Sequence, residues 1–109
     1  PKKIDVERAK KRYNWMLEEL NEFMEAVEQE DLVEEADAMI DVIYFALGTL
    51  VEMGIKPDEL FEIVQHANMS KLWEDGKPHY ADDGKTIKPI TWEDPHSKLK
   101  AVIEKMNGN

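Results

Sequence analysis

Acidic side chains recur at helical spacing in two stretches of the sequence. In the first stretch, Glu19 and Glu22 lie three residues apart and flank Ala26 at the margin of an apolar helical arc. In the second, Asp41 interrupts a run of apolar and aromatic residues, and Asp37 stands four residues before it. Residues three or four apart share one face of a helix. Each stretch therefore presents a pair of carboxylates one helical turn apart.

An ionised Asp41 within an apolar surface needs a compensating group. Burying an unpaired carboxylate costs several kcal/mol even after the protein relaxes. A lysine or a backbone donor across an interface is one source of compensation. However, Asp37 and Glu34 lie on the same stripe of the helix as Asp41, and the chain has 14 Lys and Arg against 24 Asp and Glu. A divalent cation is therefore the expected counter-charge, and pairing with lysine or backbone is the alternative.

Paired carboxylates on two helices suit Mg²⁺ or Mn²⁺, which prefer oxygen ligands and bridge phosphate groups. Hydrolysis of a phosphoryl or pyrophosphoryl bond is the chemistry that follows. The cation would screen a polyphosphate from the acidic protein and lower the pKa of an attacking water. A carboxylate that is not fully engaged by the metal could accept the proton of that water.

Helices must position these acids. An apolar period of 3.6 without Gly or Pro predicts a helix over about 5–30. Asp31 is the expected cap of a second helix over about 32–53. Pro57 is placed to begin a third helix over about 57–73.

The last third of the chain is less regular. Gly and Pro residues predict an irregular loop over 74–94, with candidate short strands at 86–88 and 90–92. A short final helix is expected over 95–106. We therefore expect a single all-α domain over 1–109, an antiparallel helical bundle completed by oligomerisation.

Length, charge and composition limit the kinds of partner that the protein is expected to bind. A 109-residue chain buries little surface alone, and its second predicted helix is apolar on nearly every side, so we expect a homodimer or homotetramer. A net charge of −10 without a basic stripe argues against a nucleic-acid polymer as partner. The absence of cysteine excludes thiolate chemistry and fits a cytoplasmic protein. No apolar stretch is long enough to indicate a membrane partner.

The third predicted helix adds polar groups to an inward-facing stripe. Asn68 and Lys71 follow Phe61 and Val64 at helical spacing, so an amide and an ammonium group could contact the base and phosphate of a nucleotide. A surface position for Lys71 and a backbone bond for Asn68 are the alternatives. Trp73 and Trp92 could stack on a base, although packing is the commoner role of large aromatics near a loop.

Several segments resemble the all-α nucleoside triphosphate pyrophosphohydrolases, the superfamily of MazG-type enzymes. Residues 18–22, Glu-Glu-Leu-Asn-Glu, resemble the first acidic motif of that superfamily, and residues 37–44 resemble the second. Residues 67–72 and 83–89 are similar to its phosphoribosyl-ATP pyrophosphohydrolase-like branch. The resemblance covers most of the chain.

This resemblance implies Mg²⁺-dependent hydrolysis, with Mn²⁺ able to substitute, of a nucleoside triphosphate between the α and β phosphates. Glu19, Glu22 and Asp41 match the metal ligands of the superfamily. Glu18 matches an adjacent glutamate that helps orient the site, and either it or Glu22 would activate water. Asn68 would position the nucleotide and Lys71 would neutralise a phosphate.

The second motif departs from the superfamily at one position. The usual glutamate three residues before the aspartate is Ala38 here, and Asp37 stands four before. Because both positions are neighbours of Asp41 on a helix, Asp37 is expected to replace that glutamate as a metal ligand. Glu34 is a lesser candidate in an alternative register of the motif.

The predicted biological role is the cleansing of the nucleotide pool, and the pattern leaves the base and sugar open. Two alternatives keep the helical fold without turnover. One is an interaction module whose acidic face binds a basic partner. The other is a nucleotide-sensing subunit.

Overall fold

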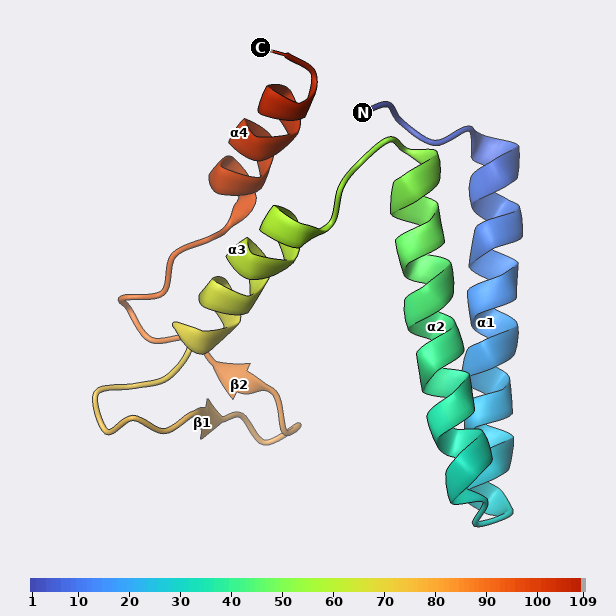
Figure 1. Cartoon of the computed structure of the whole chain (residues 1–109). Helices are drawn as coiled ribbons and strands as arrows, with labels where there is room; N and C mark the ends of the chain where they lie inside the picture. Colours follow the sequence, from blue (N-terminus) through green and yellow to red (C-terminus); the bar gives the residue numbers. More distant parts are fainter. Residues whose placement is uncertain (109) are drawn as a thin grey trace. The chain divides into compact units, whose positions relative to one another are not determined.

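The computed structural model describes residues 1–108, and its chain forms two compact units that divide after Ile55. The first unit is an antiparallel pair of helices, α1 (Val6–Glu28) and α2 (Leu32–Glu52), which lie side by side in Figure 1. The helices predicted over 5–30 and 32–53 are confirmed. None of the helices described within residues 1–108 is both long and apolar enough to cross a membrane.

Aspartate caps define where both helices begin. The Asp5 carboxylate accepts a hydrogen bond of 3.2 Å from the backbone N–H of Arg8, and Asp31 accepts one of 3.2 Å from the N–H of Glu34. Such bonds satisfy N–H groups that have no partner within the first helical turn. The predicted cap at Asp31 is therefore confirmed.

Gly54 ends α2. Its φ of +69° lies in the left-handed region, which glycine adopts without a steric clash of Cβ. The N–H of Gly54 donates to the carbonyl of Val51, and that of Ile55 donates to the carbonyl of Leu50, both at 2.9 Å. These two bonds satisfy the last carbonyls of the helix in the manner of a Schellman motif.

The second unit contains α3 (Asp58–Met69), a hairpin of β1 (His79–Tyr80) and β2 (Thr86–Ile87), and α4 (His96–Met106). The two strands are antiparallel, with His79 opposite Ile87 and Tyr80 opposite Thr86. The helix predicted over 95–106 is confirmed, as is the strand at Thr86–Ile87.

Two predictions for this unit were wrong. The third helix ends at Met69 instead of about residue 73, because the hydroxyl of Ser70 bonds back to the carbonyl of Ala67 and the chain then turns. No strand forms over residues 90–92, where one was predicted. Conversely, β1 forms where no strand was predicted. A strand of two residues is too short to show an alternating pattern.

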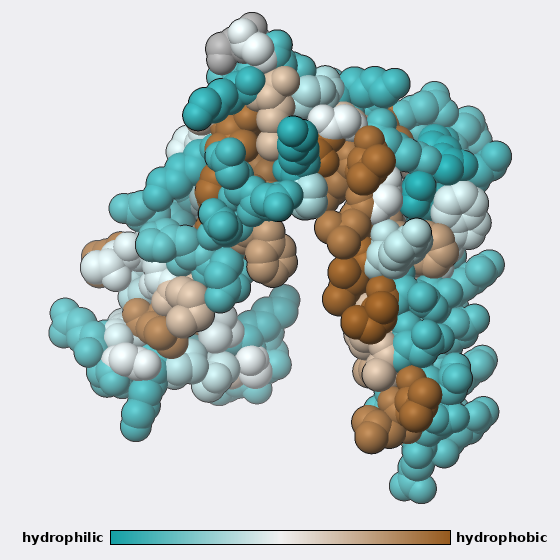
Figure 2. All heavy atoms as spheres, in the orientation of Figure 1, coloured by the Kyte–Doolittle hydropathy of each residue, from teal (hydrophilic) through white to brown (hydrophobic). Residues whose placement is uncertain are grey.

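The buried core of the described residues is small. Apart from Pro89, the buried apolar residues within 1–108 are three alanines and one isoleucine, Ala26, Ala38, Ala67 and Ile55. Large apolar side chains remain exposed along α2, where brown atoms gather in Figure 2. The most exposed of these in the middle of the helix are Ile40, Ile43 and Tyr44, at 61%, 54% and 76%.

Candidate active site

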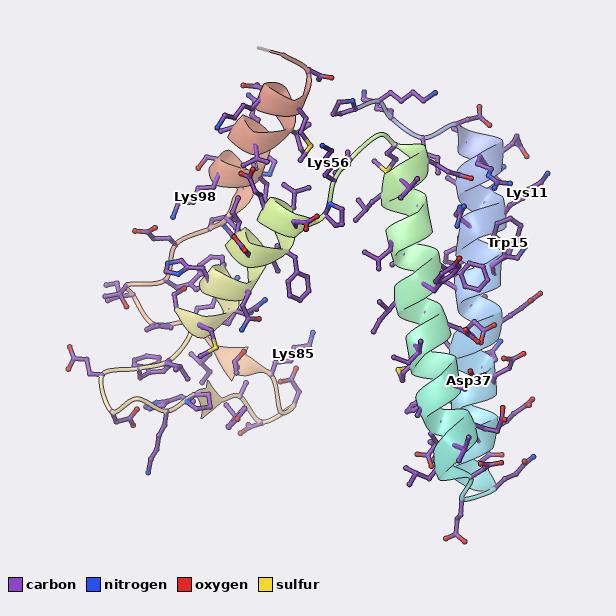
Figure 3. All side chains as sticks on the ribbon, in the orientation of Figure 1. Lys11, Trp15, Asp37, Lys56, Lys85 and Lys98 are labelled. Atoms are coloured by element: carbon purple, nitrogen blue, oxygen red, sulfur yellow. The ribbon has the colours of Figure 1, made fainter. Side chains whose placement is uncertain are left out.

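The seam between α1 and α2 brings together side chains that lie three or four residues apart on each helix. Ala26 and Ala38 are buried, at 4% and 2% exposed, so the two backbones approach closely at one end of the seam. Farther along, the rings of Trp15 and Phe45 pack with their centroids 5.8 Å apart. Figure 3 labels Trp15 on α1 and Asp37 on α2.

Three of the predicted metal ligands meet in this seam. The pKa of Glu19 is raised to about 7, first because burial disfavours its charged form. The nearby carboxylates of Glu22 and Asp41 raise it further by hydrogen bonding and charge repulsion. The structure thus joins the first acidic motif on α1 to the aspartate of the second motif on α2.

The Glu19 carboxylate carries an unsatisfied oxygen. Its Oε2 atom is buried and has no hydrogen-bond partner. Buried polar atoms are nearly always hydrogen-bonded, so an exception at a cluster of acids points to a missing ligand. A hard cation with oxygen ligands fits this donor set, since it would satisfy Oε2 and relieve the repulsion among the acids.

The predicted set of four acids does not converge completely. Among residues 1–108, no three His, Asp or Glu side chains are arranged so that they could already hold a metal ion. Glu22 and Asp41 lie near enough to Glu19 to raise its pKa, whereas Asp37 lies one turn before Asp41 on α2 and is exposed, as Glu22 is. Carboxylates of like charge repel one another, which favours spread side chains when protein groups alone surround them.

The other two candidate acids are exposed, as Glu22 and Asp37 are. Glu18 neighbours Glu19 in the chain but is exposed. Glu34 is also exposed, and its backbone N–H donates to the capping carboxylate of Asp31. Glu34 and Asp37 are therefore alike in exposure, and of the two only Asp37 lies one helical turn from Asp41.

An arginine cluster at the other end of the seam was not predicted from the sequence. Arg8 donates to both carboxylate oxygens of Glu52, and Arg12 donates to Oε1 of Glu52 at 2.9 Å. These bonds, with that of Arg8 contributing most, lower the pKa of Glu52 to about 2. Both guanidinium groups also lie over the ring of Trp15, at 5.0 and 5.4 Å from its centroid.

One signal in the sequence could have revealed this cluster. Arg8, Arg12, Trp15 and Glu19 follow one another at spacings of four, three and four residues, which places all of them on one face of α1. The face that carries the acids therefore also carries two arginines. The acids were predicted to share this face, whereas the two arginines were not.

The two predicted substrate contacts lie in the second unit. The amide of Asn68 donates to the carbonyl of Val64 at 3.0 Å, which is the backbone bond considered from the sequence. Lys71 is half-buried and follows the end of α3. Their roles in substrate binding stay predictions.

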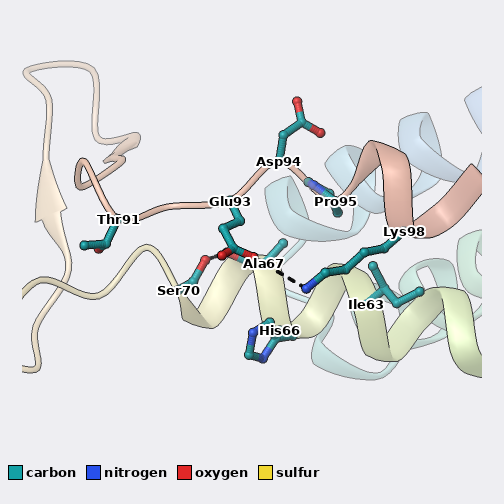
Figure 4. Close-up of a pocket in the computed structure, with 9 residues that line it drawn as sticks. All are labelled: Ile63, His66, Ala67, Ser70, Thr91, Glu93, Asp94, Pro95 and Lys98. Carbon is teal, nitrogen blue, oxygen red and sulfur yellow. Dashed lines mark hydrogen bonds and ion pairs between the residues drawn. The ribbon is translucent and has the colours of Figure 1, made fainter.

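A small pocket in the second unit does not resemble a ligand site. Figure 4 shows it between α3 and the segment that leads into α4, with an ion pair of 3.5 Å between Lys98 and Glu93 at its wall. Its volume is about 150 Å³, below the roughly 300 Å³ at which small-molecule sites begin. Because Lys98 and Glu93 compensate each other, no charged group in this ion pair calls for a ligand.

The chain is similar to a known protein family and to solved structures. The model of the phosphoribosyl-ATP pyrophosphohydrolase family matches residues 1–68, which include the acids of α1 and α2. A crystal structure described as a "putative NTP pyrophosphohydrolase" from Exiguobacterium sp. 255-15 is 33% identical, with a TM-score of 0.63. That match covers 96% of this chain and 83% of the other. Among curated proteins, none matches the chain.

Proposed function

This chain belongs to the phosphoribosyl-ATP pyrophosphohydrolase family, and from that membership we propose that it hydrolyses a nucleoside triphosphate between the α and β phosphates. The products are the nucleoside monophosphate and pyrophosphate, and the proposed role is cleansing of the nucleotide pool. The observation that carries this proposal is the buried, unpartnered oxygen of Glu19 among the carboxylates of Glu22 and Asp41.

Glu19, Glu22, Asp37 and Asp41 are the residues proposed to hold Mg²⁺, with Mn²⁺ as a substitute. When bound, such a cation neutralises phosphate charge and lowers the pKa of an attacking water. Glu22 and Glu18 are the candidates to accept the proton of that water. Both side chains are exposed, and the effect of Glu22 on the pKa of Glu19 supports Glu22 as the closer candidate.

Asn68 and Lys71 are proposed to contact the substrate. The ammonium group of Lys71 would neutralise a phosphate in a protein whose net charge is −10. Asn68 would orient the nucleotide through the part of its amide that the bond to Val64 leaves free, since an amide group has two N–H donors and one acceptor oxygen.

A homodimer or homotetramer is proposed as the active form. The exposed apolar side chains of α2 support this, because contiguous apolar surface of this kind marks an interface. The small buried core supports it too, since Ile55 is the one large apolar side chain buried within residues 1–108 apart from Pro89. A second copy would supply the missing core.

The test is pyrophosphate release from a panel of ribo- and deoxynucleoside triphosphates with millimolar Mg²⁺. We expect release with at least one of them and none with EDTA. Thermal unfolding with Mg²⁺ and nucleotide tests binding separately, because a ligand that binds only the folded state raises Tm. Binding without release would indicate a nucleotide sensor, and indifference to both ligands would indicate an interaction module.

A further inference from the structure

The loop that follows α3 holds two aromatic rings in a stack. The rings of Trp73 and His79 have centroids 4.6 Å apart and planes inclined by 13°. The indole N–H of Trp73 donates to the carbonyl of Ile87 at 3.0 Å, and Nε2 of His79 forms a hydrogen bond of 3.0 Å with Asp75. Each ring is therefore held by a bond at its polar edge, so the orientation of the pair is set before any ligand binds.

Asp75 is fixed beside this stack. One of its carboxylate oxygens bonds His79, and the other accepts the backbone N–H of Lys77 at 2.9 Å. The bond to His79, followed by that to Lys77, holds the pKa of Asp75 below its ordinary value. The backbone N–H of Trp73 donates to the carbonyl of Lys77 at 3.0 Å and closes the same turn. A charged acceptor thus has a defined position next to the two rings.

A cavity of about 460 Å³, which we call the Trp73 pocket, borders the stack. It is lined by both rings and Asp75, and also by Glu74, Pro89, Ile90 and Thr91. Its volume lies within the roughly 300–1,000 Å³ of small-molecule sites, and a mainly apolar lining with a few polar groups is typical of them. If Trp73 served only to pack the loop, protein atoms would be expected to fill the space beside it.

We propose that the Trp73 pocket binds the nucleobase of a nucleotide and prefers bases that carry an exocyclic amino group. This inference rests on the proposed function, which it extends to base recognition. Aromatic side chains stack on the planar face of any base, while a carboxylate at the rim accepts hydrogen bonds from an amino group. Adenine, cytosine and guanine carry such a group, whereas uracil and thymine do not.

Nucleosides without phosphate test the pocket directly. Cytidine and uridine form a close pair, because they differ only at position 4, which is an amino group in cytidine and a carbonyl in uridine, and at the adjacent N3, which carries a proton only in uridine. In an NMR titration of the full chain with EDTA present, we expect cytidine to shift the indole N–H signal of Trp73, with a dissociation constant on the order of 1 mM. Uridine is expected to bind at least about 5-fold more weakly, since in the same pose its 4-carbonyl, an acceptor, would face the carboxylate where cytidine presents an amino donor.

Two variants test the contributions of ring and carboxylate. Trp73→Leu should weaken cytidine binding at least about 5-fold through loss of stacking. Asp75→Asn should retain binding but abolish the preference for cytidine over uridine. Trp92→Phe is the matched control, because Trp92 does not line the pocket and its indole N–H bonds the carbonyl of Ala67 instead. It should bind both nucleosides as the unaltered chain does.

Should Trp73→Leu fail to fold, intermolecular nuclear Overhauser effects between cytidine and the rings of Trp73 and His79 test the unaltered chain. Shifts confined to residues outside the pocket, or equal binding of cytidine and uridine, would overturn the proposal. Because these titrations need neither metal nor turnover, their failure would leave the hydrolase assignment intact. Conversely, binding of cytidine in the pocket by a chain that releases no pyrophosphate would refute the hydrolase assignment and leave the pocket proposal intact.

Discussion

Gly48 on α2 makes room for Arg12 on α1. A Cβ atom at position 48 would lie 2.8 Å from Nη1 of Arg12, closer than such atoms approach in proteins. The side chain of Arg12 is only 14% exposed, and it bonds Glu52 and lies over Trp15. A glycine inside a helix costs about 1 kcal/mol relative to alanine. At this position the glycine instead admits the guanidinium group into the seam.

A double-mutant cycle tests this relationship between the helices. In the Arg12→Ala background, Gly48→Ala should stabilise the protein by about 1 kcal/mol, the full gain in helix propensity. In the unaltered chain the gain should be at least about 0.5 kcal/mol smaller, since the guanidinium group must shift. Chemical denaturation measures both differences, and near-UV circular dichroism of Trp15 reports the shift. Equal effects in the two backgrounds would show that Arg12 does not need the space.

Asp41→Asn tests the metal site. Asparagine has nearly the same shape but lacks the negative charge, so turnover should fall at least about 100-fold as the charge stabilisation of the cation is lost. Glu25→Gln is the control, because Glu25 is exposed on α1 and lies outside the acidic cluster. It removes one charge from the same helix pair and should leave turnover unchanged. Near-normal hydrolysis by Asp41→Asn would refute the assignment.

The pairing of Glu52 with two arginines predicts a dependence of stability on pH. Its pKa is about 2 in the folded protein, against about 4.3 for an unperturbed glutamate. The stabilisation is therefore fully present above about pH 4.3 and is lost as pH falls toward 2. Glu52→Gln should lower Tm at pH 7 by at least about 4 °C, and the difference should narrow below pH 4.

Glu7→Gln is the control for that measurement. Glu7 pairs with Lys10 at 3.4 Å, but their side chains are 78% and 66% exposed. Surface ion pairs of this kind contribute little. We expect no measurable change in Tm. A decrease in Tm as large as that of Glu52→Gln would mean that both variants respond to the change in net charge and not to a specific ion pair.

Ile43→Glu tests the proposed oligomer. Ile43 lies among the exposed apolar residues of α2, so a charge there should break a dimer or tetramer into monomers. Val6→Glu alters a residue at the start of α1 that is 66% exposed, against 54% for Ile43, and should leave the assembly intact. Sedimentation velocity distinguishes the outcomes. A monomeric unaltered chain at micromolar concentration would contradict the proposal.

Local properties of the sequence determined the helices and the identity of the acids. The period of the apolar residues predicted α1 and α2 nearly to their ends, and Asp31 marked the cap between them. These features depend on neighbours within one or two turns, so they can be recognised without tertiary contacts. The same spacing placed Glu19 and Glu22 on one face, and Asp37 and Asp41 on another.

Contacts between distant residues required the tertiary structure. Arg12 meets Glu52 across 40 residues of sequence, and Glu19 meets Asp41, because α1 and α2 pack in one register. A shift of one turn along either helix would preserve every local pattern while bringing different side chains together. Side-chain packing sets that register, as the small Ala26 and Ala38 and the space at Gly48 illustrate. Helical periodicity is a local property, whereas the register between two helices depends on how their surfaces fit.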